Sequence, residues 1–309
     1  MNEYPLKQTN PAFFLGIDGG GTKTVFRLVD ENGTTIRECI KGATNPNDIG
    51  MDNALVILKS GITEACADVP FSEITMFAGI AGGGMSGNNA VILERFFREF
   101  GFSAFENGSD IENLVALSDE DPRVLVIMGT GFIVYALNQA ERKRIAGWGQ
   151  FFDEGGSGYT LGKDAITAVL CAGDGSGAPT ALCPLLERKV GESAEAHLTR
   201  FYQGGKSYIA GFSDIVFEAA EKGDAVALEI LEKNFAFAAH RIDTAVAYLP
   251  QTENEIPVLL AGGITAKSDV IFPIMKKHLQ SRCQLIRLTE EPIEGAVRRA
   301  RTIGKAKKR

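Results

Sequence analysis

An aspartate followed by a glycine-rich run stands near the start of the chain, at residues 18–24 (D-G-G-G-T-K-T). Successive backbone N–H groups in such a turn form a concave site that binds anions. The Thr22 hydroxyl and the Lys23 amine could face phosphate oxygens as well. A carboxylate cannot bind phosphate directly, but Asp18 could hold Mg²⁺ through water while the metal bridges phosphates. The run therefore indicates a nucleotide phosphate site, with a plain tight hairpin as the alternative.

Two common phosphate-binding loops also contain clustered glycine, and neither fits this run. The P-loop needs its lysine directly after the last glycine, but Thr22 precedes Lys23 here. The dinucleotide-binding motif needs a third glycine, where this chain has Thr24. Both loops also lead into a helix whose N-terminus holds the phosphate. Here residues 25–29 are typical of a strand and residues 32–33 (Asn-Gly) of a hairpin turn, so we expect a glycine-rich hairpin.

Strands and helices are mixed along the chain. Strands are expected at 13–17, 25–29, 74–80, 124–128, 132–135 and, as the last strand, 257–261, and a returning strand is expected to begin at 34–36 after the Asn-Gly turn. Apolar positions spaced three and four residues apart predict helices at 52–67, 89–100, 110–117, 159–172, 178–190, 207–221, 224–249, 268–280 and 293–303. A strand, a Gly-Thr-Gly turn and a second strand recur at 124–135. This repeat near residue 120 predicts two α/β domains with a cleft between them.

Composition and charge exclude several classes of protein. The 309 residues are 45% apolar and 23% charged, as in ordinary globular proteins. A net charge of −7 argues against nucleic acid as a partner. No apolar run is long enough to span a membrane, and residues 1–11 lack the apolar core of a signal peptide. The five scattered cysteines are typical of reduced thiols, so we expect a cytoplasmic protein.

Glycine is the one residue type in excess, with 35 copies that gather in clusters. Clustered glycine allows tight turns and close approach of the backbone to a ligand. The cluster at 82–84 is expected to line the cleft, but no ligand is assigned to it. The cluster at 204–205 is interpreted as a helix break.

Several motifs occur in an order that resembles one superfamily. The runs at 18–24, 129–131 (G-T-G) and 261–263 (A-G-G) resemble the nucleotide loops of the sugar kinase, heat-shock ATPase and actin superfamily. Within it, the chain is similar to the group of N-acetylglucosamine kinases and BadF/BadG/BcrA/BcrD ATPases. Further support comes from T-N-P-N at 44–47, G-W-G at 147–149, G-S-G-Y at 156–159 and D-G-S-G-A-P-T-A-L at 174–182.

The resemblance implies a fold of two ribonuclease H-like domains of the actin/hexokinase type, with an ATP cleft between them. The domains would be 1–119 and 120–291, with a C-terminal helix at about 292–309 packing on the first. ATP and Mg²⁺ are the implied cofactors. The implied ATP-binding residues are Gly20, Gly21, Thr22, Lys23, Thr130, Gly131, Gly262 and Gly263.

The resemblance also assigns a catalytic role to Asp110. The amino sugar kinases of the family have an aspartate general base one strand before the second phosphate turn, and Asp110 occupies that place. It would take the proton from the sugar hydroxyl as that oxygen attacks the γ-phosphoryl group. The local sequence fits a helix cap equally well, so the cap is the alternative.

The implied sugar-binding residues are Asn45, Gly147 and Trp148. A turn is the alternative for Asn45, and a place in the core is the alternative for Trp148. The chain departs from the family after G-W-G, where three residues instead of four precede D-E-G. Alignment on the flanks therefore places Glu154, rather than Asp153, at the family's sugar-contacting aspartate. Which amino sugar fits is left open by this departure.

The expected function is ATP-dependent phosphorylation of an amino sugar by a homodimer. The candidate substrates are N-acetylglucosamine, N-acetylmuramic acid and glucosamine. A second interpretation is an ATPase that activates a dehydratase or reductase. Such activators hold an iron–sulfur cluster with nearby cysteines, whereas no two cysteines of this chain are close in sequence. A third is a nucleotide-dependent scaffold of the actin type, against which Asp110 and the sugar-type motifs argue.

Overall fold

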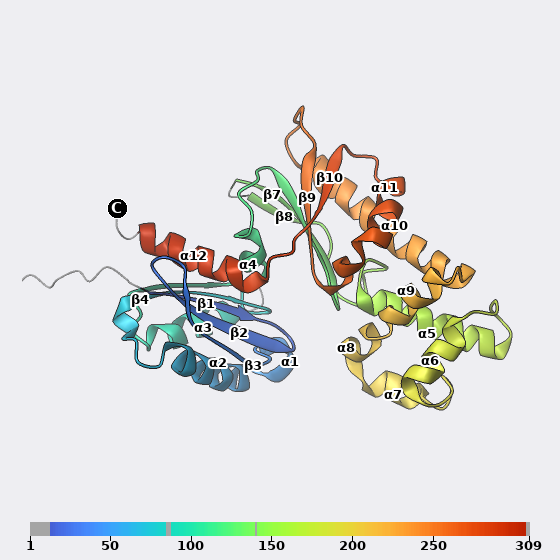
Figure 1. The fold of residues 1–309 in the computed structure, drawn as a ribbon, viewed down its shortest axis with the longest axis horizontal. Helices are drawn as coiled ribbons and strands as arrows, with labels where there is room; N and C mark the ends of the chain where they lie inside the picture. The colour runs from blue at the N-terminus through green and yellow to red at the C-terminus, as the bar shows by residue number, and fades with distance from the viewer. Residues whose placement is uncertain (1–12, 85–87, 140, 307–309) are drawn as a thin grey trace, which may run out of the picture. The chain divides into compact units, whose positions relative to one another are not determined.

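The computed structural model describes residues 13–84, 88–139 and 141–306. The chain forms two compact units (Figure 1). Unit 1 comprises Met1–Asp119 and Glu290–Arg309, and unit 2 comprises Glu120–Thr289. The polar segment 1–11, on which the signal-peptide argument rests, lies outside the described residues.

Unit 1 contains a five-stranded sheet in the order β3-β2-β1-β4-β5. Its strands are β1 (Phe13–Gly19), β2 (Lys23–Asp30), β3 (Thr35–Gly42), β4 (Ile74–Ile80) and β5 (Ala104–Gly108). The first three strands pair antiparallel, whereas β4 pairs parallel to β1 and β5 parallel to β4. The carboxyl ends of β1, β4 and β5 therefore meet at one edge of the sheet.

Helices cover both faces of this sheet (Figure 1). They are α1 (Pro46–Ile49), α2 (Met51–Cys66), α3 (Asn89–Arg98), α4 (Ile111–Val115) and α12 (Pro292–Ala306), with a short 3₁₀ helix at Phe71–Glu73. Because side chains alternate along a strand, Leu15 and Ile17 of β1 pack with α2 and α3, while Phe14 packs with α12. The C-terminal helix is thus part of the core of unit 1.

Unit 2 repeats the same sheet plan in the order β10-β9-β6-β7-β8. Its strands are β6 (Arg123–Met128), β7 (Phe132–Asn138), β8 (Glu141–Arg144), β9 (Ile256–Ala261) and β10 (Cys283–Arg287). Again three antiparallel strands come first, and the later two strands are parallel. The predicted repeat of strand, glycine turn and strand therefore extends over both whole sheets.

The helices of unit 2 lie mostly between β8 and β9 in the chain. They are α5 (Gly158–Asp174), α6 (Leu182–Val190), α7 (Leu198–Gln203), α8 (Gly205–Ala210), α9 (Ser213–Glu221), α10 (Ala225–Tyr248) and, after a 3₁₀ helix at Gly263–Lys267, α11 (Ser268–His278). The long helix α10 packs on β6, β7 and α5 around one apolar core.

Three strands were not expected from the sequence: β5, β8 and β10. Each of them is an edge strand of its sheet. An edge strand has one unpaired side and needs no continuous apolar run; β8, for example, reads Glu-Arg-Lys-Arg. The expectation that residues 257–261 form the last strand is therefore wrong, because β10 follows and pairs parallel to β9.

Two expected helices also differ. The helix expected at 207–221 is two helices, α8 and α9, which are separated at residues 211–212. The helix expected at 178–190 begins only at Leu182. The Asp224 carboxylate accepts hydrogen bonds from the Ala181 N–H at 2.7 Å and from the Thr180 hydroxyl at 2.8 Å, and these bonds hold residues 180–181 outside the helix.

The contact between α12 and α4 gives a test of the packing in unit 1. A Cβ at Gly295 would lie 1.7 Å from the Asn113 carbonyl oxygen. Alanine in place of a helical glycine normally gains about 1 kcal/mol, but overpacking costs about 1–3 kcal/mol, so we expect the clash to dominate. Gly295→Ala should lower the free energy of unfolding in urea by up to about 2 kcal/mol. Lys305→Ala, on an exposed position of the same helix, should change it by less than about 0.5 kcal/mol. Unchanged stability of Gly295→Ala would contradict this close packing.

Candidate functional site

In unit 1 the proposed catalytic and phosphate-binding residues follow adjacent strand ends. Asp18 of β1 is in register with Gly79 of β4, and Gly79 is in register with Gly108 of β5. Asp110 comes shortly after Gly108, at the start of α4. Ligands of open α/β sheets bind at the carboxyl ends of parallel strands, and this edge is such a place.

The first glycine turn is held tightly at this edge. The Gly20 N–H donates to the Lys23 carbonyl at 2.9 Å, and the Gly20 carbonyl accepts from the Thr44 N–H at 3.0 Å. Within the described chain, the backbone N–H groups of Gly21 and Thr22 have no backbone acceptor, and both residues are exposed. These two amides are therefore not used by the backbone of the turn, and their binding of an anion stays a prediction.

Asp18 is fixed by a residue that the sequence analysis did not single out. The Asn113 side-chain amide donates to Asp18 Oδ1 at 2.7 Å and to the Gly79 carbonyl at 3.3 Å, and Asn113 is fully buried. Burial raises the pKa of Asp18 to about 6; the Asn113 hydrogen bond lowers it, and the neighbouring Asp110 charge raises it. A cation next to this carboxylate would offset the cost of its burial.

The chemistry of Asp18 fits Mg²⁺ held through water and phosphate oxygens. Mg²⁺ keeps several waters and usually takes only one or two carboxylates from the protein. Among the described residues, no group of three or more His, Cys, Asp and Glu side chains is placed to hold a metal ion. An ion at Asp18 would therefore need its remaining ligands from water and from the nucleotide.

Asp110 stands at the N-cap position of α4, but its side chain makes no capping hydrogen bond. The capping bond that the cap alternative expects is therefore missing, although the backbone N–H groups of Asp110 and Ile111 lie near the carboxylate. Burial raises its pKa, and the N–H groups of Ile111 and Asp110 itself act in the opposite direction. A carboxylate with a raised pKa is a better proton acceptor, so the environment suits a general base.

Asn45 lies in a network of short polar contacts at the start of α1. Its Oδ1 accepts from the Asn47 N–H at 3.1 Å, and its Nδ2 donates to Asp48 Oδ2 at 2.6 Å. Asn45 thus caps α1, as the turn alternative expects. A Cβ at Gly21 would lie 3.2 Å from Asp48 Oδ2, so this network adjoins the first glycine turn.

The glycine cluster at 82–84, which has no ligand assigned from the sequence, joins these parts of unit 1. A Cβ at Gly82 would lie 2.3 Å from Asn45 Oδ1, and one at Gly84 would lie 2.7 Å from the Ser109 backbone nitrogen. The backbone after β4 therefore passes between Asn45 and the residue before Asp110. Only glycine leaves room for both approaches.

In unit 2 the second glycine turn is oriented by helix α5. The Gly129 carbonyl accepts from the Gly158 N–H at 2.8 Å, and the Thr130 carbonyl accepts from the Tyr159 N–H at 3.2 Å. Within the described part of the chain, the N–H groups of Thr130 and Gly131 have no backbone acceptor. With its carbonyls bound to α5, the turn keeps two amides for another partner.

The third nucleotide motif lies directly against this turn. A Cβ at Gly262 would lie 2.5 Å from the Met128 carbonyl oxygen, and Gly262 has a φ of +100°. The close approach and the positive φ both require glycine. Unit 2 thus brings Thr130, Gly131, Gly262 and Gly263 together.

The Gly-Trp-Gly segment forms a rigid loop beside β7. The Asp153 carboxylate accepts from the Gly147 N–H at 3.3 Å and from the Gly149 N–H at 2.9 Å. Asp153 is buried, whereas Glu154 is exposed. The structure therefore gives the loop-holding role to Asp153, which the alignment on the flanks passed over, and a sugar contact by Glu154 stays a prediction.

Trp148 lies at the tip of this loop. Its side chain is 59% exposed, and the Arg144 guanidinium lies over its ring at 4.7 Å from the ring centre. The alternative that Trp148 is a core residue is therefore wrong.

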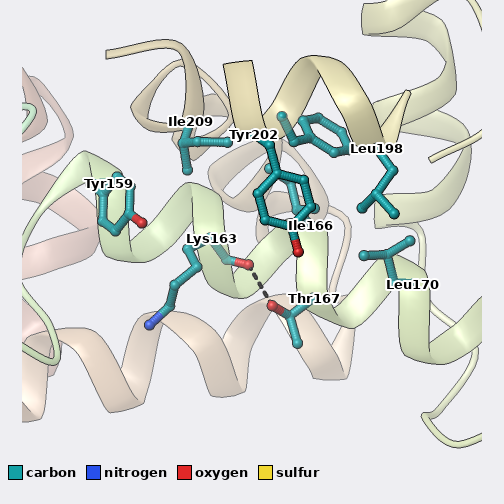
Figure 2. Close-up of a pocket in the computed structure, with 9 residues that line it drawn as sticks. Tyr159, Lys163, Ile166, Thr167, Leu170, Leu198, Tyr202 and Ile209 are labelled. Carbon is teal, nitrogen blue, oxygen red and sulfur yellow. Dashed lines mark hydrogen bonds between the residues drawn. The ribbon is translucent and has the colours of Figure 1, made fainter. Parts of the chain in front are cut away.

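A cavity of about 230 Å³ opens in unit 2 among α5, α7 and α8 (Figure 2). Its lining consists of Tyr159, Lys163, Ile166, Thr167, Leu170, Leu198, Phe201, Tyr202 and Ile209. The Thr167 hydroxyl donates to the Lys163 carbonyl at 2.9 Å, as Figure 2 shows. The Tyr159 N–H bonds the Thr130 carbonyl, so the cavity adjoins the second glycine turn. This cavity could not be predicted from the sequence, because its lining comes from three separate helices.

Residues 15–297 match the model of the BadF/BadG/BcrA/BcrD ATPase family. The chain belongs to this family. An N-acetyl-D-glucosamine kinase of Dictyostelium discoideum is 27% identical over 307 residues, covering 92% of this chain and 96% of the relative. An N-acetylmuramic acid/N-acetylglucosamine kinase of Clostridium acetobutylicum is 27% identical over 303 residues, covering 94% and 98%.

Solved structures show the fold of this BadF/BadG/BcrA/BcrD family member. A protein from Chromobacterium violaceum, proposed to be an N-acetylglucosamine kinase, has a TM-score of 0.72 at 25% identity, covering 93% of this chain and 98% of that one. A glucokinase of the ROK family from Streptomyces griseus, in complex with glucose and AMPPNP, has a TM-score of 0.61 at 15% identity, covering 95% and 99%. The predicted α/β fold of the actin/hexokinase type is confirmed.

Among the described helices, none combines the length and apolar character that a bilayer crossing requires.

The raised pKa of Asp18 predicts a pH-dependent cost to stability. The folded-state pKa is about 6 against an ordinary value of 3.8, so the folded state binds the proton more tightly and its stability falls as pH rises through this interval. We expect Asp18→Asn to raise the free energy of unfolding at pH 7.5 by about 1–3 kcal/mol, since one pKa unit corresponds to about 1.4 kcal/mol. Urea unfolding from pH 4 to 8 would measure this effect. Asp119→Asn, an exposed carboxylate of the same unit, should follow the wild-type curve. An Asp18→Asn protein less stable than wild type at pH 7.5 would show that the carboxylate stabilises the fold instead.

Proposed function

We propose that this protein is a kinase that transfers the γ-phosphoryl group of ATP to a hydroxyl of an amino sugar. The proposal is supported by membership of the family, by relatives named as N-acetylglucosamine and N-acetylmuramic acid/N-acetylglucosamine kinases, and by the geometry of unit 1. The observation that carries it is the position of Asp110. Its carboxylate makes no helix-capping hydrogen bond and follows the same sheet edge as the first glycine turn. A phosphate loop beside a proton acceptor with a raised pKa is what transfer to a hydroxyl needs.

In this proposal ATP is bound by residues of both units. The turn at 20–23 and the amides of Thr130 and Gly131 bind phosphate oxygens, and residues 262–263 lie against the nucleoside. Asp18 is the residue that would hold Mg²⁺ through water, and the bound ion would neutralise charge on the phosphates. In the proposal, the fixed amides and the Lys23 ammonium bind the same phosphate group. They supply the positioning on which phosphoryl transfer depends.

The sugar is bound by Asn45, Gly147, Trp148 and Glu154 in the same proposal, and Asp110 accepts the proton of the attacking hydroxyl. The bond formed joins the sugar oxygen to the γ-phosphorus, the bond broken joins that phosphorus to the β-γ bridging oxygen, and ADP leaves. A homodimer in the cytoplasm remains part of the proposal.

A substrate panel tests the reaction. ADP release with ATP and Mg²⁺ should be stimulated by at least one of N-acetylglucosamine, N-acetylmuramic acid and glucosamine, and by glucose far less. The Asp110→Asn variant should lower kcat for the preferred sugar about 10²–10⁴-fold, the usual contribution of a general base, with KM for ATP unchanged. Asp119→Asn is the matched control and should retain full activity. No stimulation by any amino sugar would overturn the kinase proposal, while a near-normal Asp110→Asn enzyme would overturn only the base.

Trp148 is the only tryptophan of the chain and therefore reports on the sugar directly. Its 59% exposure should decrease when a sugar covers the ring, so we expect a blue-shifted emission that saturates with the substrate concentration. Titration of the protein with the best sugar of the panel, without nucleotide, measures this shift. Saturating sugar that leaves the emission unchanged would remove Trp148 from the sugar site. Glucose, which should stimulate ADP release far less, serves as the negative control.

A further inference from the structure

A lysine that the sequence analysis did not single out lies over the second glycine turn. Lys206 belongs to α8, and a Cβ built on Gly131 would lie 3.1 Å from its ammonium nitrogen. The two residues are far apart in sequence, but both lie in unit 2. The ammonium therefore stands beside the backbone that carries the free amides of Thr130 and Gly131.

Lys206 differs from most lysines of unit 2 in having no counterion. Within the residues that the structure describes, its ammonium makes no ion pair or hydrogen bond. Carboxylate partners within 3.1 Å are present for Lys189, Lys222, Lys233, Lys267 and Lys277. The Lys206 ammonium and the N–H groups of Thr130 and Gly131 are all hydrogen-bond donors. A group of donors without an acceptor favours the binding of an anion.

The orientation of the turn supports the same conclusion. The carbonyls of Gly129 and Thr130 accept from α5, and the Gly131 carbonyl accepts from the Gly129 N–H at 2.9 Å. Each backbone acceptor of the turn therefore already has a donor. The anion that fits has several oxygens, one for the ammonium and others for the amides, as a phosphate has.

Helix α8 holds Lys206 in place. The Tyr208 hydroxyl lies 2.5 Å from His197 Nε2, and His197 Nδ1 lies 2.6 Å from Glu192 Oε1. His197 is buried, so this chain of contacts anchors α8 from one side. On the other side, α8 comes so close to α5 that a Cβ at Gly162 would lie 1.9 Å from the Ile209 carbonyl oxygen.

We propose that Lys206 binds a phosphate of ATP at the second glycine turn, together with the amides of Thr130 and Gly131. The inference rests on the ATP-binding part of the proposed function and adds to it a charged phosphate ligand from unit 2. Lys206 supplies a point charge to oxygens that the neutral amides can only hydrogen-bond.

The test compares nucleotide binding by Lys206→Met, Lys206→Arg and Lys222→Met with the wild type. Lys222→Met also removes one positive charge from unit 2, at an exposed ion pair with Glu218. Isothermal titration calorimetry with ATP and Mg²⁺ gives the Kd, and displacement of ATP by adenosine gives the Kd of a ligand without phosphate. We expect Lys206→Met to weaken ATP about tenfold or more, the effect of losing one charge-assisted contact, and to leave adenosine within about twofold. Lys206→Arg should lose less, and Lys222→Met should bind as the wild type does.

Two results would overturn the proposal. The first is a Lys206→Met protein whose Kd for ATP equals that of Lys222→Met. The second is an equal loss for ATP and adenosine, which would reveal a distorted site rather than a lost phosphate contact. A wild-type protein that binds ATP but phosphorylates no amino sugar would refute the proposed function, and the comparison of variants would still decide the role of Lys206. A wild-type protein that binds no ATP would overturn both.

Discussion

The buried side-chain amide of Asn113 connects the parts of unit 1 that are proposed to handle phosphate and sugar. It donates to Asp18 and to the Gly79 carbonyl, and it fits only because Gly79 carries no side chain. Gly295 leaves room for the Asn113 backbone carbonyl in the same way. Among the described residues, its Oδ1 has no hydrogen-bond partner, which costs about 1–3 kcal/mol. The fold accepts this cost and so places a donor on a carboxylate whose burial would otherwise be more costly. The same short helix, α4, begins next to Asp110.

Unit 2 repeats the strand plan of unit 1, but different charged groups stand at the corresponding sheet edge. At the sheet edge of unit 1 stand two acids with raised pKa values, Asp18 and Asp110. At the corresponding edge of unit 2, the turn at 129–131 offers amides, and Lys206 adds a positive charge. In the proposed function, the two acids of unit 1 serve the metal and the proton, and the glycine turns of both units serve the phosphates. The strand pairing is the same in both units, so it does not set which charges stand at each sheet edge. The residues at the strand ends and the helices beside them set these charges.

The Gly-Trp-Gly loop shows that two adjacent carboxylates can take different places. The family resemblance places Glu154, rather than Asp153, at the sugar-contacting aspartate, and this contact stays a prediction. In the structure, however, Asp153 turns inward and accepts the amides of Gly147 and Gly149. Two charge-assisted hydrogen bonds from backbone N–H groups stabilise the carboxylate in this inward orientation. Asp153 therefore holds the loop from inside, whereas Glu154 is exposed.

The sequence by itself determined the features that depend on neighbours along the chain. These are the two glycine hairpins, the central strands with their continuous apolar runs, the amphipathic helices and the motifs that led to the family. Only the tertiary structure revealed the edge strands β5, β8 and β10, whose polar residues are held by pairing rather than by burial. It also decided the contacts of Asn113 with Asp18, of Gly82 with Asn45 and of Lys206 with Gly131. Each of these contacts joins segments distant in sequence, and an exposed or polar side chain leaves no periodic signal from which its partner could be found.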